Sequence, residues 1–97
     1  MISFDQLARI KKNSYIINCA RGPLINEDAL IQALTSGRIN GVALDVMEIE
    51  PLPSSSRLRE FSNCIFGTHN SSNTHEAVAR VNQESIKNLL LGLEILK

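Results

Sequence analysis

Apolar and polar residues follow one another along this chain in two patterns. Three short runs are apolar nearly throughout, which predicts buried strands. These runs span residues 14–20, 39–46 and 63–67. Three further segments repeat their apolar residues at helical spacing, on one face in the first two and on two sides in the last, which predicts helices. These segments span residues 3–13, residues 26–37 and the chain from about residue 74 onward. The predicted order is helix, strand, helix, strand, loop, strand, helix, with one helical turn in the loop near residues 56–60.

The helix ends carry recognisable signals. Ser3 with Gln6 has the spacing of a capping box, and so has Asn73 with Glu76 before the last helix. Asn26 is the expected N-cap of the middle helix, and Gly37 is the residue expected to end it.

Strands that are apolar on both sides belong in parallel sheets covered by helices on both faces. The predicted fold class is therefore α/β, with a parallel sheet of about three strands and flanking helices. Right-handed crossovers would bring all three strand carboxyl ends to one edge, where ligands bind in open α/β sheets. Arg21 and His69 follow predicted strands, and the segment 45–50 begins at the end of one, so all three are expected at this edge.

Composition narrows the class of protein. The 97 residues suffice for one small domain or a piece of a larger one, and ten basic residues balance ten acidic residues. Neutral charge argues against nucleic-acid binding and against a polybasic membrane anchor, and the apolar tail from Leu89 is too short to span a bilayer. Cys19 and Cys64 form no disulfide framework, and no signal peptide is evident, so a cytoplasmic location is expected.

The strand ends hold a possible site for reduction of a carbonyl beside a carboxylate. Arg21 could bind a substrate carboxylate through its two-pronged guanidinium, and His69 could act as general acid and base. Glu48 or Glu50 could favour the charged imidazole. On position alone, a solvated turn, an acidic loop and a structural histidine explain the same residues, and they remain the leading alternative.

Other chemistries have less support. The soft ligands Cys19, Cys64, His69 and His75 match no zinc spacing, so no metal is expected. Cys64 lies within a predicted strand, where an inert buried thiol is favoured over a nucleophile paired with His69. The five glycines form no phosphate-binding motif.

Four stretches together resemble the D-isomer-specific 2-hydroxyacid dehydrogenases. They are Ile-Asn-Cys-Ala-Arg-Gly-Pro-Leu-Ile at 17–25, Gly-Arg-Ile-Asn-Gly-Val-Ala-Leu-Asp-Val at 37–46, Glu-Ile-Glu-Pro at 48–51 and Thr-His-Asn-Ser-Ser-Asn-Thr at 68–74. The motifs occur in the family's order and cover essentially the whole chain. The resemblance implies a fragment of a doubly wound, Rossmann-like domain that binds NAD.

The resemblance also implies roles for particular residues. Arg21 would hold the substrate, His69 would transfer the proton, and Glu50 rather than Glu48 would pair with His69. The residues that match the family's cofactor contacts are Cys19, Ala20, Arg21, Asp45, His69, Asn70, Ser71 and Ser72.

The same resemblance implies how the chain relates to a complete enzyme. Residues 1–73 would be the C-terminal half of the NAD-binding domain, and residues 74–97 a long helix returning toward a substrate domain that this sequence lacks. The substrate would be a D-2-hydroxy acid or its 2-keto acid. The residues of these motifs are most similar to those of the family branch that acts on 3-phosphoglycerate in serine biosynthesis.

Members acting on glyoxylate, hydroxypyruvate or D-lactate are alternatives, as is a non-catalytic NAD-binding or scaffolding relative. The full-length protein would be a homo-oligomer, a dimer or a tetramer. The isolated chain is expected to be inactive.

Overall fold

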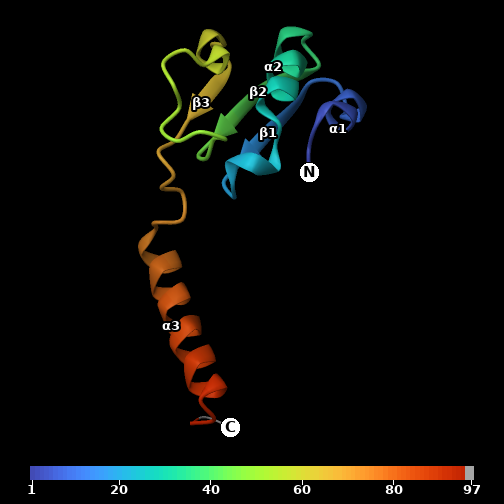
Figure 1. Ribbon diagram of the computed structural model, residues 1–97. Coiled ribbons are helices and arrows are strands. Elements are labelled where there is room, and N and C mark those ends of the chain that lie inside the picture. Colours follow the sequence, from blue (N-terminus) through green and yellow to red (C-terminus); the bar gives the residue numbers. More distant parts are fainter. Residues whose placement is uncertain (96–97) are drawn as a thin grey trace.

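The computed structural model describes residues 1–95 of the chain (Figure 1). Its elements, in order, are α1 (Phe4–Arg9), β1 (Ser14–Asn18), the 3₁₀ turn η1 (Gly22–Leu24), α2 (Glu27–Thr35), β2 (Ile39–Leu44), the 3₁₀ turn η2 (Arg57–Glu60), β3 (Cys64–Phe66) and α3 (His75–Gly92). The predicted element order is therefore confirmed. Leu96 and Lys97, which end the predicted segment 74–97, lie outside the described residues.

The three strands form one parallel sheet in the order β1-β2-β3. Ile17 of β1 lies opposite Ala43 of β2, which in turn lies opposite Ile65 of β3. All three strands therefore point the same way, and their carboxyl ends share one edge, as predicted. Each strand is two residues shorter than its apolar run, because residues such as Cys19 and Val46 continue the run beyond the ladder.

One face of the sheet carries the hydrophobic core. The helix α2 begins at the N-cap Asn26, whose side chain accepts from Ala29 N at 2.8 Å, and it buries its apolar stripe against β2. The buried cluster comprises Leu7, Ile25, Ala29, Leu30, Ile31, Ala33, Leu34, Ile39, Val42, Leu44, Met47, Leu52 and Leu58. Leu52 and Leu58 bring the loop 45–56 and η2 into this core.

The other face of the sheet is open. Ile17 and Ile65, adjacent across the central strand, are 72% and 70% exposed, and Tyr15 is also exposed. The expectation that helices cover both faces is wrong for this chain. The helices α1 and α2 and the segment with η2 all pack on the same side of the sheet, so the apolar residues of the opposite side meet no other element among residues 1–95.

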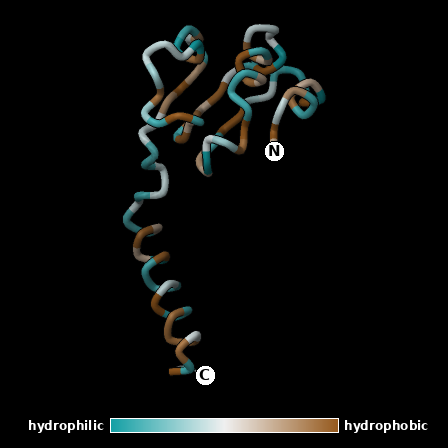
Figure 2. The backbone as a smooth tube through the Cα atoms, viewed as in Figure 1, coloured by the Kyte–Doolittle hydropathy of each residue, from teal (hydrophilic) through white to brown (hydrophobic). Residues whose placement is uncertain are grey.

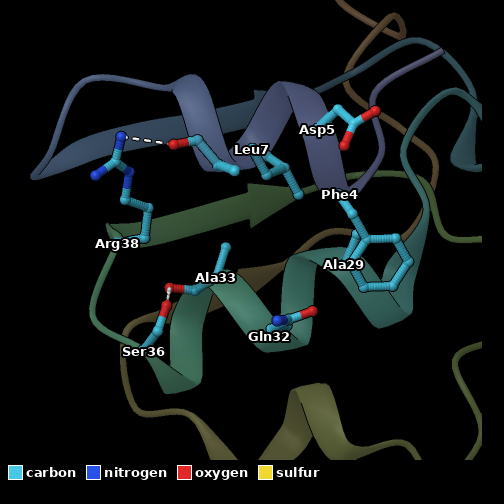
Figure 3. Close-up of a pocket in the computed structure, with 9 residues that line it drawn as sticks. Phe4, Asp5, Leu7, Ala29, Gln32, Ala33, Ser36 and Arg38 are labelled. Carbon is cyan, nitrogen blue, oxygen red and sulfur yellow. Dashed lines mark hydrogen bonds between the residues drawn. The ribbon is translucent and has the colours of Figure 1, made fainter.

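A cavity of about 380 Å³ separates α1 from α2 (Figure 3). Phe4 and Leu7 face Ala29 and Ala33 across it, and Arg38 closes one end by donating from Nη2 to Ala8 O at 2.6 Å. None of the predicted site residues lines this cavity, so it plays no part in the candidate site.

The helix α3 projects away from the sheet and none of its residues is buried (Figure 1). The molecule is consequently elongated, with a longest extent of 56 Å. Hydrophobic residues follow the whole helix (Figure 2), among them Val81, Ile86 and Leu89. The N-cap is Thr74, whose side chain accepts from Ala77 N at 3.2 Å, and not Asn73 as predicted.

Candidate active site

His69 and Glu50 form a hydrogen-bonded pair at the carboxyl edge of the sheet. His69 Nδ1 lies 2.8 Å from Glu50 Oε2. This contact is the one ion pair among residues 1–95. The two side chains are 44% and 35% exposed, so the pair is accessible from solvent. Because a carboxylate accepts only, Nδ1 carries the proton in this pair and Nε2 remains available.

The backbone at His69 has a φ of 57°, in the left-handed region that a residue with a side chain rarely adopts. Asp45 stabilises this conformation by accepting three hydrogen bonds from the loop. Its carbonyl oxygen accepts from His69 N at 2.8 Å, and its carboxylate accepts from Asn70 N at 3.1 Å and Ser71 N at 2.9 Å. The three bonds fix the loop in which His69 lies, so a strained residue is held at the site.

The hydrogen bonds to Asp45 lower the pKa of its carboxyl group. The N–H of Ser71 contributes most and the N–H of Asn70 next. Gly67 makes this arrangement possible, because a Cβ there would lie 2.3 Å from Asp45 Oδ1. Asp45 therefore remains an ionised acceptor beside the end of β3.

Glu50 is oriented by its own loop as well as by His69. Its Oε1 accepts from Met47 N at 3.0 Å, while Oε2 faces the imidazole. The bond with His69, followed by the bond from Met47, lowers the pKa of the Glu50 carboxyl group. Glu48 is turned elsewhere, with Oε1 accepting from Glu27 N at 2.8 Å. Of the two glutamates considered from the sequence, Glu50 is the one beside His69.

Arg21 lies in the loop that follows β1. Asn18, the one buried polar residue of the described chain, shapes this loop by donating to Arg21 O at 3.0 Å and accepting from Ala20 N at 3.1 Å. The Arg21 guanidinium is exposed and donates to Ala20 O at 2.7 Å. The loop reaches the edge shared with Glu50 and His69, but the Arg21 side chain contacts neither residue.

A cavity of about 500 Å³ opens beside the His69–Glu50 pair. Asp45, Phe66 and Thr68 contribute to its wall, and so does Arg59. The Arg59 side chain donates to Leu52 O at 2.6 Å and Pro53 O at 2.9 Å, which holds the chain just after Glu50. Arg59 and Gly67 were not singled out from the sequence, because their contribution depends on contacts between distant segments.

The predicted cofactor-binding residues fall into two groups at this edge. Cys19, Ala20 and Arg21 are exposed after β1, and His69, Asn70, Ser71 and Ser72 are exposed after β3. Asp45 lies between them and is ionised, with lone pairs left to accept an amide N–H. This donor and acceptor set fits the carboxamide of a nicotinamide ring. Cys64 lies apart from it on β3, half-buried, where burial raises the pKa of its thiol.

The parallel α/β sheet and the His–carboxylate pair at its carboxyl edge define part of a ligand-binding α/β domain. A family model described as "D-isomer specific 2-hydroxyacid dehydrogenase, NAD binding domain" matches residues 1–71. The chain therefore belongs to the family of D-isomer specific 2-hydroxyacid dehydrogenases, within their NAD-binding domain. The predicted family, the Rossmann-like fold class and NAD as the cofactor are confirmed at this level.

Named relatives align with nearly the whole chain. A glyoxylate reductase of Thermofilum pendens is 42% identical over 97% of the chain and 28% of its own length. A glyoxylate/hydroxypyruvate reductase B of Serratia proteamaculans is 45% identical over 96% and 29%. A D-3-phosphoglycerate dehydrogenase of Synechocystis sp. is 46% identical over 96% and 17%. The chain thus spans less than a third of the length of these relatives.

Solved structures agree with this fold. A D-isomer specific 2-hydroxyacid dehydrogenase of Xanthobacter autotrophicus Py2, in complex with NADPH and MES, is 43% identical with a TM-score of 0.68, over 70% of this chain and 22% of that one. The NAD complex of a Lactobacillus delbrueckii ssp. bulgaricus family member is 30% identical with a TM-score of 0.72, over 97% and 33%. Within residues 1–95, no helix is both long and apolar enough to cross a membrane.

Proposed function

We propose that this chain is part of an oxidoreductase that transfers a hydride between NAD and a D-2-hydroxy acid or the corresponding 2-keto acid. The observation that carries the proposal is the 2.8 Å contact between His69 Nδ1 and Glu50 Oε2 at the carboxyl edge of the sheet. An imidazole held by a carboxylate is suited to proton transfer near neutral pH. Family membership supplies the reaction class.

In this mechanism Arg21 binds the substrate carboxylate through paired N–H donors. During reduction His69 Nε2 donates a proton to the carbonyl oxygen, and during oxidation it removes the proton from the hydroxyl group. Glu50 keeps the imidazole oriented and stabilises its protonated form. The nicotinamide, when bound, accepts or supplies the hydride at the neighbouring carbon.

The cofactor is proposed to lie over the two groups of exposed residues at the sheet edge. Cys19, Ala20 and Arg21 form one side, and the residues 69–72 form the other. Asp45 accepts the carboxamide N–H between them. Residues 1–73 then make up the C-terminal half of the cofactor domain, and α3 leads from it toward a substrate domain.

The proposed substrate is 3-phosphoglycerate, because the motif residues are most similar to those of the family branch that acts on this substrate. The relatives keep glyoxylate and hydroxypyruvate as alternatives, because proteins named for these substrates are as similar to the chain as the phosphoglycerate dehydrogenase is. Comparing kcat/KM of the complete protein for these three substrates and for D-lactate separates them. A preference for glyoxylate would overturn the 3-phosphoglycerate assignment and leave the reaction class intact.

His69 provides the direct test of the reaction. In the complete protein that carries this segment, His69→Gln should lower kcat by about 10²- to 10⁴-fold while the Kd for NAD stays nearly constant. His75→Gln is the matched control, since His75 is an exposed histidine at the start of α3. Turnover that survives the change at His69 would show that another group transfers the proton.

A non-catalytic NAD-binding or scaffolding relative would have lost one or more of the three reacting residues. Arg21, Glu50 and His69 are all present, which favours the enzyme. The homo-oligomeric state of the full-length protein and its cytoplasmic location stay predictions.

A further inference from the structure

Two loops at the sheet edge carry the groups that the proposed reaction uses. The first loop, residues 19–26, joins β1 to α2 and contains Arg21. The second loop, residues 45–56, joins β2 to η2 and contains Glu50. They start side by side, because Asp45 N donates to Asn18 O at 3.0 Å. Farther out, the first loop is tied to the N-terminal segment, because Ile2 N donates to Leu24 O and Asn26 N donates to Ile2 O, both at 2.9 Å. These bonds do not connect it to the second loop.

The two loops touch again in the middle. Gly22 packs directly on the peptide that joins Met47 to Glu48, and a Cβ at Gly22 would lie 1.8 Å from Met47 O. This contact is possible only for glycine. It sets the residue next to Arg21 against the segment that leads to Glu50.

Next to this contact, Glu48 of the second loop and Glu27, which directly follows the first loop, form a reciprocal pair of hydrogen bonds. Glu48 Oε1 accepts from Glu27 N at 2.8 Å, and Glu27 Oε1 accepts from Glu48 N at 2.7 Å. Each carboxylate satisfies the main chain of the other residue, and a charged acceptor makes such bonds stronger than neutral ones. Glu27 is also the first residue of α2, where unpaired N–H groups favour a negative charge.

We propose that Glu27 and Glu48 are positioning residues that fix the Arg21 loop against the Glu50 loop, so that Arg21 and His69 act on the same substrate molecule. The inference rests on the function proposed above. Neither glutamate touches the substrate. Both act through the backbone, because the Arg21 side chain is bonded only to its neighbour Ala20 and depends on its loop for its position.

The test compares Glu48 variants of the complete protein by steady-state kinetics. Glu48→Ala should lower kcat/KM for the hydroxy acid on the order of 10²-fold, since a displacement of about 1 Å has this effect. Glu48→Gln should restore most of the activity, because its amide oxygen can still accept from Glu27 N. Glu48→Asp, charged but one methylene shorter, should fall with Glu48→Ala.

A double variant and a control complete the experiment. Glu27→Ala with Glu48→Ala should lose more activity than either single variant, since each carboxylate accepts one of the two hydrogen bonds and only the double variant removes both. Asp28→Ala alters the next acidic residue of the α2 first turn and should leave turnover unchanged. If Glu48→Ala does not fold, Glu48→Asp and Glu48→Gln still give the comparison.

The outcomes separate this inference from the proposed function. Full activity in Glu48→Asp, or a Glu48→Gln variant as slow as Glu48→Asp, would overturn the positioning role while the loss in His69→Gln still stands. Full activity in His69→Gln would overturn the proposed function itself.

Discussion

Gly22 makes its closest contact where the two site loops meet, and it leaves no room for a side chain. Gly22→Ala should destabilise the fold by about 1–3 kcal/mol, the usual effect of overpacking, because the new Cβ would collide with Met47 O. Denaturant unfolding measures the change. Gly92→Ala is the control, since a Cβ at Gly92 would meet no atom within 4 Å. Equal stability of the Gly22 variant and the wild-type chain would contradict the observed packing.

Asp45 and Glu50 make stability depend on pH. The folded state lowers both pKa values below their ordinary values of 3.8 and 4.5. Their contribution is therefore fully present above the ordinary pKa and is lost as pH falls through the lowered, folded-state pKa. We expect the free energy of unfolding to decrease as the solution is acidified below about pH 4.5.

Urea unfolding at several acidic pH values measures this dependence. Asp45→Asn should flatten it, whereas Asp28→Asn, at an exposed position of α2, should not. The same slope in the Asp45→Asn variant and the wild-type chain would show that Asp45 is not the group involved.

At the scale of elements, α3 differs from α1 and α2 because no tertiary contact buries it. Its stability therefore depends on its own hydrogen bonds and on its cap. Thr74→Ala should weaken the helix by about 1 kcal/mol and lower its population, as far-UV circular dichroism would record. Asn73→Ala is the matched control, because Thr74 and not Asn73 accepts from Ala77 N. A larger loss of helix in the Asn73 variant would contradict the observed cap.

The helices and strands themselves followed from sequence patterns. The apolar runs around Ile16, Val42 and Ile65 predict the strands, and the stripe of α2 with its Asn26 cap predicts that helix. The predicted ends of the helices and strands were less accurate than their order. The N-cap of the last helix lies one residue later than predicted, at Thr74 and not at Asn73. Both residue types are capable N-caps, and only the backbone geometry selects between them.

At the scale of the whole molecule, two apolar surfaces face solvent. One is the open side of the sheet at Ile17 and Ile65, and the other follows α3 at Ile86 and Leu89. Exposed apolar surface of this kind drives association. We expect the isolated 97-residue chain to self-associate and to show no NAD-dependent turnover.

Sedimentation velocity over a range of concentrations measures this association. Ile86→Lys should reduce it by placing a charge on the apolar surface of α3. Asn82→Lys adds the same charge to the same helix at a polar position and should change it less. An isolated chain that is monomeric at all concentrations would contradict the expectation.

The sequence by itself determined the α/β class, the order of the elements and the family, because apolar periodicity and short motifs are local properties. It also placed Arg21, Glu50 and His69 after strands that had to end at one edge. Spacing alone left Glu48 and Glu50 open as the partner of His69, since they are two residues apart and chemically identical, and the family motif pointed to Glu50. Only the folded chain turns Glu48 toward Glu27 N and Glu50 toward the imidazole. It also decided that one sheet face stays open, because the side on which a helix packs depends on contacts between distant segments.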